Sequence, residues 1–236
     1  GFISLGGGGG GGGKKQKRQA RPVFVLGGSA SGGAPKEVIN VLQNLGRVHI
    51  VSKWKSNHPS SLSKNASHMM ELVHAACEGP AAEGSVYLGG NSFGCRVAVE
   101  IIANHQGELP SCVAQDRVLC FGYPLFGPNQ AKPGSGTDRV HPLEQLPREV
   151  LVSFVSGEKD EFLRREYQST TGIAALQEVC QSMAASTKVA AVEGDTWTVM
   201  RALIGDVGVQ CANFESGLDT TGSDTNTPLH TLLLTP

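Results

Sequence analysis

The sequence predicts an α/β fold in which a mainly parallel sheet of about six strands is covered by helices on both faces. Short, continuous apolar runs support this, because they are typical of strands buried on both faces. The runs alternate along the chain with segments whose apolar residues recur at helical spacing, which is the pattern of strand–helix–strand units. Glycine-rich turns follow several of the runs, where a strand has to end.

Each predicted strand is an apolar run between turn signals. In chain order these strands cover residues 22–26, 48–51, 85–88, 117–121, 150–155 and 188–192. The first helix is expected between Pro35 and Gly46, because proline favours a helix start and glycine a helix end. Apolar stripes of helical spacing predict the other helices, over residues 69–77, 93–102, 173–183 and 199–204. Residues 122–149, rich in Gly and Pro, are expected to form a long loop with room for one helical turn.

The composition is that of one folded domain with biased ends. Apolar residues make up 39% and charged residues 17% of the 236-residue chain, and the mean hydropathy is −0.11, as in globular proteins. We expect residues 1–21 to be a flexible Gly-rich and basic leader, residues 22–207 to fold, and residues 208–236 to be a loosely ordered, low-complexity tail. No apolar stretch reaches the roughly 18 residues that a membrane span needs.

The charge is unevenly distributed along the chain. Residues 1–21 carry five basic and no acidic residues, which leaves 15 basic against 21 acidic residues in the remainder. A domain this acidic is unlike a nucleic-acid binder, whose domain is usually basic, so no nucleic-acid partner is expected. The basic cluster at 14–21 is expected to be a solvated linker, with a nuclear-import or anion-binding patch as the alternative.

None of the six cysteines belongs to a C-x-x-C pair, so no metal site is expected. Several of them lie in apolar periodic segments, where a reduced cysteine packs as a small core residue. No secretory signal is recognised either. Together these features predict an intracellular location, cytoplasmic or nuclear. The cysteines are Cys77, Cys95, Cys112, Cys120, Cys180 and Cys211.

The sharpest chemical signal is the segment 90–94, Gly-Asn-Ser-Phe-Gly. It fits the pattern G-x-S-x-G directly after a predicted strand and directly before a predicted helix, which is the context of a nucleophile elbow. Glycines are needed because the turn is tight, and the helix N-terminus adds partial positive charge and free N–H groups beside the serine. We therefore predict Ser92 as the nucleophile and Gly90 and Gly94 as the elbow glycines.

A second glycine-rich loop, residues 27–33, follows the first strand, where an oxyanion loop is expected. The backbone N–H group of Ser29 or Ala30, together with that of Phe93, is predicted to hold a tetrahedral oxyanion. Each such donor contributes about 2.7–4 kcal/mol in the transition state. The loop fits neither the phosphate-loop nor the dinucleotide-binding pattern, so no cofactor is expected.

A catalytic acid and then a histidine should follow the serine in the chain. Asp160, just after the fifth predicted strand, is the predicted acid that orients the histidine, ahead of Glu158 and Glu161. No histidine stands directly after the last strand. The nearest one downstream is His230, while His141 precedes the acid. His230 is therefore the candidate base. The triad is incomplete at the position directly after the last strand, where its histidine is expected.

Three blocks of the chain resemble a small α/β-hydrolase-like family. This family includes the testis-expressed hydrolase-like proteins and the subunit-3-like scaffold of the nonspecific-lethal histone acetyltransferase complex. The blocks are the segments 87–96, 119–125 and 139–162, and the resemblance runs from about residue 22 to 200. The chain is also similar, more distantly, to dienelactone hydrolases.

The resemblance implies an α/β-hydrolase fold that lacks its usual opening strands. It implies Ser92 as the nucleophile and Asp160 as the acid, and it puts the family histidine at Thr196 or Trp197. Asn91 stands where an arginine is usual.

Two functions remain open at this point. The first is a serine hydrolase acting on a small-molecule ester or similar acyl bond. The second, motivated by the missing histidine, is a catalytically inactive hydrolase-fold scaffold that binds a protein partner. A third alternative is that the sequence beyond residue 195 departs from the natural one. His141 matches a histidine that recurs in the family outside the triad, and it is expected to pack in its loop.

Overall fold

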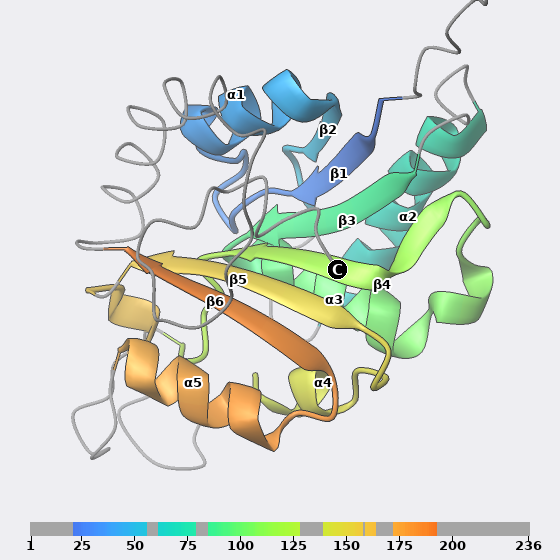
Figure 1. The fold of residues 1–236 in the computed structure, drawn as a ribbon. Coiled ribbons are helices and arrows are strands. Elements are labelled where there is room, and N and C mark those ends of the chain that lie inside the picture. Colours follow the sequence, from blue (N-terminus) through green and yellow to red (C-terminus); the bar gives the residue numbers. More distant parts are fainter. Residues whose placement is uncertain are drawn as a thin grey trace, which may run out of the picture.

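Six parallel strands form one sheet in the order β2-β1-β3-β4-β5-β6 (Figure 1). The computed structural model of the protein describes residues 21–55, 61–78, 85–127, 139–157, 159–163 and 172–192. The predicted fold class is confirmed within these ranges. The predicted leader, the tail 208–236 and the helix at 199–204 lie outside the described residues, apart from Arg21.

The helices and strands alternate as the sequence predicts. In chain order they are β1 (Val23–Gly27), α1 (Lys36–Leu45), β2 (Arg47–Val51), α2 (Leu62–Glu78), β3 (Val86–Asn91), α3 (Phe93–Asn104), η3 (Gln106–Glu108), β4 (Val113–Phe121), α4 (His141–Glu144), β5 (Leu151–Gly157), η4 (Glu161–Leu163), α5 (Ile173–Ser182) and β6 (Ser186–Val192).

Several strands are longer than predicted, β3 and β4 among them. β3 continues through two glycines to Asn91, and a side chain at the first of these glycines would not fit: a Cβ on Gly89 would lie 2.7 Å from the carbonyl oxygen of Leu119. β4 begins at Val113, and its pairing with β3 is irregular near that end. Its extra residues are mostly half-buried or exposed, so their apolar pattern is weak.

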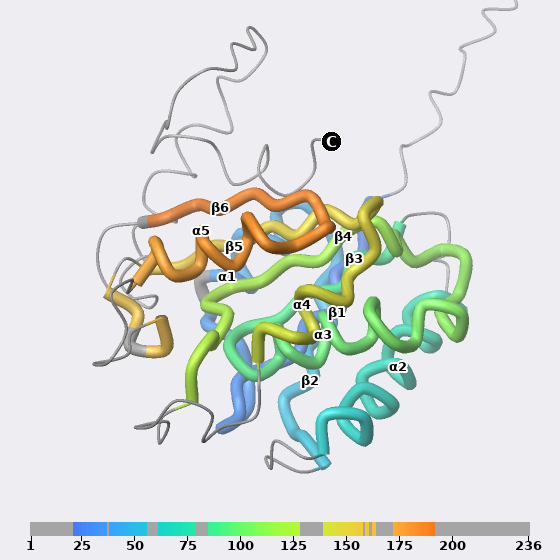
Figure 2. The backbone as a smooth tube through the Cα atoms, turned by 90° about the horizontal axis from the view of Figure 1, so that it is seen from below, coloured from blue at the N-terminus to red at the C-terminus, as the bar shows by residue number. Residues whose placement is uncertain are grey.

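Helices cover both faces of the sheet. On one face the buried residues of α1 (Val38, Val41 and Leu42) pack against β1, β4 and β5. On the other face α2, α3, α4 and α5 contribute to the larger cluster of buried side chains. There α2 and α3 lie side by side (Figure 2). The strands are therefore buried on both faces, which explains their continuous apolar runs.

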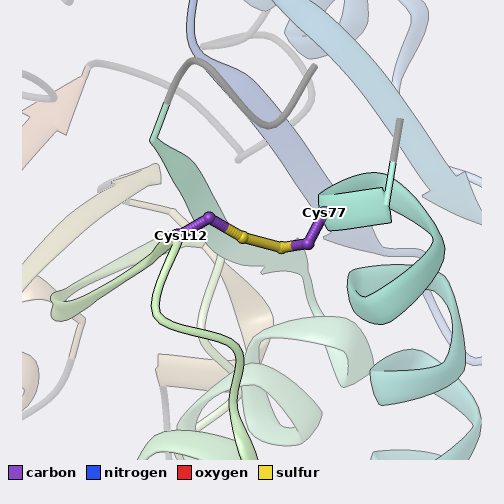
Figure 3. Close-up of a disulfide and its surroundings, with 2 residues drawn as sticks. All are labelled: Cys77 and Cys112. Carbon is purple, nitrogen blue, oxygen red and sulfur yellow. A yellow bond between two sulfur atoms is a disulfide. The ribbon is translucent and has the colours of Figure 1, made fainter. Parts of the chain in front are cut away.

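Cys77 and Cys112 form a disulfide that joins the last turn of α2 to the residue before β4 (Figure 3). The expectation of reduced cysteines is therefore wrong for this pair. The two residues are 35 positions apart in sequence, and the pairing of β3 with β4 brings them together: the N–H of Val86 donates to the carbonyl of Cys112. Cys95 and Cys120 are buried free thiols, as expected for small core residues.

Candidate active site

Ser92 and the loop after β1 meet at the carboxyl edge of the sheet. The chain leaves β1 for α1 on one face and leaves β3 for α3 on the other, so the paired strands β1 and β3 form a topological switch point. In open α/β sheets, ligands bind in the crevice outside such a point. Gly27, the last residue of β1, is in register with Gly90, two residues before the serine.

The backbone of Ser92 has an unusual conformation. Its φ of 52° and ψ of −113° make it the one non-glycine residue with positive φ in the described part of the chain. Such backbone strain costs about 1–3 kcal/mol and is concentrated at functional sites. The Ser92 side chain makes no capping hydrogen bond to α3, so its hydroxyl is not used to satisfy the helix N-terminus.

Glycines on both sides of Ser92 allow the tight turn. A Cβ on Gly90 would collide with the backbone of Gly94, and a Cβ on Gly94 would collide with the carbonyl of Gly27. The elbow therefore lies directly against the end of β1. Two hydrogen bonds hold it in place: the Ser92 N–H donates to the carbonyl of Phe121 (3.0 Å), and the Cys95 N–H donates to the carbonyl of Ser92 (3.0 Å).

The thiol of Cys95 also supports the elbow, and it is not placed to act as a nucleophile. Its Sγ donates to the carbonyl of Gly90 at 2.9 Å and is fully buried. The neighbouring Cys120 is also fully buried. Burial, with a hydrogen bond to Cys95, raises the pKa of the Cys120 thiol well above its usual value. A structural thiol that is buried in this way is inert.

Phe93, the residue after Ser92, is held from two sides. The ring of Trp54 packs edge-on against the Phe93 ring, with 5.4 Å between the centroids. The guanidinium of Arg96 lies over the Phe93 ring at 5.9 Å, and burial lowers the pKa of Arg96. The backbone N–H of Phe93 belongs to the first turn of α3, where N–H groups have no intrahelical acceptor. Its role as an oxyanion donor stays a prediction.

In the loop after β1, the backbone N–H groups of the two predicted donors differ in their hydrogen bonding. The N–H of Ser29 already donates to the carbonyl of Gly33 at 2.8 Å, and the N–H of Gly28 donates to the carbonyl of Val51 at 3.0 Å. The N–H of Ala30 makes no such hydrogen bond within the described residues, and Ala30 is exposed. Ser29 thus has its N–H hydrogen-bonded within the loop, whereas Ala30 does not, and the oxyanion role of either stays a prediction.

Trp54 was not identified from the sequence. It follows β2, and its Nε1–H donates to the carbonyls of Gly28 (3.2 Å) and Ser29 (2.9 Å). A single tryptophan in a loop carries no sequence signal that distinguishes such a role from ordinary packing. The contact depends on β2 lying next to β1 in the sheet.

Asp160 lies in the loop after β5. Its side chain is buried, and Oδ1 accepts a hydrogen bond from the N–H of Phe162 at 2.9 Å. The carbonyl of Phe162 in turn accepts from the N–H of Phe126, which joins this loop to the loop after β4. Since β4 lies between β3 and β5, Asp160 and Ser92 follow strands about 10 Å apart.

His230, the predicted base, lies outside the described residues, as do Thr196 and Trp197. β6 ends at Val192, in register with Gly157, so the chain leaves β6 beside the loop that carries Asp160.

His141 is described: it is exposed at the start of α4, a helix that packs against α3. Glu158 also lies outside the described residues.

Within the described residues no three or more His, Cys, Asp or Glu side chains gather closely enough to bind a metal ion. No helix there combines the length and the apolar character needed to cross a membrane.

Residues 49–188 match a protein family described as alpha/beta hydrolase domain. Comparison with curated protein sequences finds no match. Among solved structures, the chain is similar to Est1E from Butyrivibrio proteoclasticus with ferulic acid bound: 13% identity over 84% of this chain and 93% of that chain, with a TM-score of 0.53. It is also similar to the esterase Pf2001 of Pyrococcus furiosus: 13% identity, 78% of each chain and a TM-score of 0.54.

A third similar structure is the NocB thioesterase domain in covalent complex with a fluorophosphonate nocardicin G analogue. Its identity to this chain is 18% over 78% of this chain and 90% of that chain, with a TM-score of 0.50. At identities this low, the likeness to the three structures concerns the fold.

Proposed function

We propose that this chain, which belongs to the alpha/beta hydrolase domain family, is a serine hydrolase that cleaves an ester or a related acyl bond with Ser92 as its nucleophile. The observation that carries the proposal is the positive φ of Ser92 between the end of β3 and the N-terminus of α3. This is the strand–turn–helix context that a nucleophile elbow requires.

In the proposed reaction the Ser92 Oγ attacks the carbonyl carbon of the substrate while a histidine takes its proton. The N–H groups of Phe93 and Ala30 stabilise the oxyanion, at about 2.7–4 kcal/mol each. Collapse of the tetrahedral intermediate breaks the bond to the leaving group, which takes the proton from the histidine. Water then hydrolyses the acyl-enzyme by the same steps and releases the acid.

The base of this mechanism is assigned to His230, with Asp160 orienting it. His230 is the one histidine that follows Asp160 in the sequence, and the order serine, acid, histidine is that of α/β-hydrolases. The side chain of Asp160 is 6% exposed, and a buried carboxylate is suited to orient an imidazole and stabilise its charged form.

The alternative proposal is a catalytically inactive hydrolase-fold scaffold that binds a protein partner. It is favoured by one observation: Thr196 and Trp197 stand where the resembled family has its histidine. Without a general base, a serine hydroxyl is a weak nucleophile. The narrower resemblance to the testis-expressed hydrolase-like proteins and the nonspecific-lethal complex scaffold stays a prediction, and so does the role of Ser92.

A fluorophosphonate probe distinguishes the two proposals, because it reacts with an activated serine. The NocB thioesterase domain forms a covalent complex with a fluorophosphonate. If this chain is a hydrolase, the Ser92 oxygen displaces fluoride from the phosphorus of the probe. The intact protein then gains the mass of one probe less HF, and Ser92→Ala abolishes the gain. Ser67→Ala, on the exposed surface of α2, is the matched control and labels normally.

Two further outcomes have definite meanings. A folded wild-type protein that neither labels nor hydrolyses short-chain nitrophenyl esters would support the scaffold. His230→Ala is expected to slow labelling at least about a hundredfold, within the range of general-base catalysis. If that variant labels at the wild-type rate, His230 is not the base and another residue has that role.

The predicted cytoplasmic or nuclear location also stays a proposal. The disulfide between Cys77 and Cys112 counts against it, because disulfides are rare in reducing compartments. Alkylation of the protein directly on cell lysis, followed by mass spectrometry of the Cys77 and Cys112 peptides, tests the location: free thiols support the prediction, and a disulfide favours an oxidising compartment.

A further inference from the structure

We infer that Trp54 is a positioning residue that directs the N–H group of Ala30 toward the oxyanion, an inference that rests on the proposed function. Trp54 lies between the two segments predicted to supply the oxyanion donors. Its indole N–H reaches the loop after β1, and its ring packs against Phe93 in the elbow.

The hydrogen bonds of the indole fix two successive peptide groups of the loop. In a trans peptide the C=O and the following N–H point in opposite directions, and the described residues contain no cis peptide bond. The carbonyl of Gly28 faces Trp54, and on the other side of the same peptide group the N–H of Ser29 donates to Gly33. This peptide group is held on both sides.

The next peptide group is held on one side only. The carbonyl of Ser29 accepts the shorter bond from Trp54 Nε1, at 2.9 Å, so the N–H of Ala30 points away from the indole. That N–H makes no hydrogen bond to another described residue. The same carbonyl also accepts a hydrogen bond from the Gly32 N–H at 3.0 Å. Trp54 and Gly32 together therefore keep the Ala30 donor in one orientation without occupying it, which is the preorganisation that an oxyanion donor needs.

The same ring limits the distance between the loop and the elbow. A Cβ placed on Gly27 would lie 3.0 Å from the Trp54 Cη2, and the ring planes of Trp54 and Phe93 cross at 84°. Trp54 thus contacts the end of β1, the oxyanion loop and the residue whose N–H is the second predicted donor. One side chain sets the position of one donor relative to the other.

Trp54→Phe separates positioning from packing, since phenylalanine keeps an aromatic ring beside Phe93 and removes the N–H. We expect the rate of fluorophosphonate labelling and the kcat for a nitrophenyl ester to fall at least about tenfold, with KM changing less than about twofold, because the oxyanion forms only in the transition state. Tyr87→Phe, which alters an aromatic residue on the α1 face, is the matched control and keeps the wild-type rate.

A second variant guards against a merely structural effect. Replacement of Trp54 by benzothienylalanine keeps the shape of the indole and exchanges its N–H for sulfur, so the same loss of kcat is expected with an unchanged melting temperature. Wild-type kcat in this variant, or a rise in KM with kcat unchanged, would overturn the positioning role while leaving the proposed hydrolase intact. Failure of the wild-type protein itself to label or turn over would instead reject the hydrolase, and with it this inference.

Discussion

The backbones of Gly27 and Gly94 lie in contact, so the end of β1 and the first turn of α3 meet with no side chain between them. A Cβ on Gly94 would collide with the carbonyl of Gly27, and a Cβ on Gly27 would lie 2.7 Å from the Cα of Gly94. This contact brings the predicted nucleophile and the predicted oxyanion loop to the same point on the sheet edge.

Gly94→Ala is therefore expected to destabilise the protein by at least about 1–3 kcal/mol, because backbone on both sides cannot move away from the added methyl group. A destabilisation would be opposite in sign to the usual effect, since alanine normally stabilises a helix relative to glycine by about 1 kcal/mol. Urea unfolding measures the difference. Gly107→Ala is the control: nothing lies within 4 Å of its Cβ, so it should cost less than about 0.5 kcal/mol. Equal stabilities of the two variants would contradict the contact.

The disulfide between Cys77 and Cys112 closes a loop of 35 positions. A cross-link over a loop of this length stabilises a protein by about 2–4 kcal/mol, largely by restricting the unfolded chain. We expect a reducing agent to lower the melting temperature of the wild-type protein. The Cys77→Ser, Cys112→Ser double variant should start at the lower value and not respond to the reductant. A wild-type melting temperature that is the same with and without reductant would count against the disulfide.

Tyr123 closes the loop after β4. Its ring is fully buried and its hydroxyl donates to the carbonyl of Arg139 at 2.7 Å. Tyr123→Phe is expected to lower the free energy of unfolding by about 0.5–1.5 kcal/mol, the usual net contribution of one hydrogen bond. Tyr87→Phe is the control, because the half-buried Tyr87 stacks on Phe24 and this ring contact survives. If Tyr123→Phe lowers the free energy of unfolding no more than Tyr87→Phe does, the hydrogen bond does not contribute to stability.

The burial of Tyr123 also predicts a dependence of stability on alkaline pH. Burial raises the pKa of Tyr123 far above its ordinary value of 10.0, so above about pH 10 the unfolded chain releases a proton that the folded protein retains. The stability that this group contributes is full below pH 10 and decreases as the pH rises further. We expect unfolding followed between pH 9 and 11 to show this decrease, and Tyr123→Phe to weaken it. If the stability of Tyr123→Phe decreases equally steeply over this pH range, other titrating groups cause the decrease.

Much of the fold could be predicted from the sequence, because its elements depend on neighbours along the chain. The first helix runs from Lys36 to Leu45, between the predicted Pro35 and Gly46. All six predicted strands are present, and the turn at Ser92 follows β3 directly. The sequence also indicated where the backbone must turn tightly, since glycine is the residue that permits close approach.

The candidate site was predicted less completely, for a physical reason. Which N–H in the loop after β1 is available depends on the hydrogen bond from Ser29 to Gly33, and a run of small residues is compatible with several such patterns. The base stays a prediction because Thr196, Trp197 and His230 lie outside the described residues.

The sequence by itself determined the alternation of strands and helices, the strand–turn–helix context of Ser92 and the glycines around it, since each depends on residue spacing along the chain. Only the tertiary structure decided the pairing of Cys77 with Cys112, the contact of Gly27 with Gly94 and the hydrogen bonds from Trp54 to the loop after β1. These contacts join segments far apart in sequence. They exist because the strand order and register bring the segments together, and local periodicity carries no information about either.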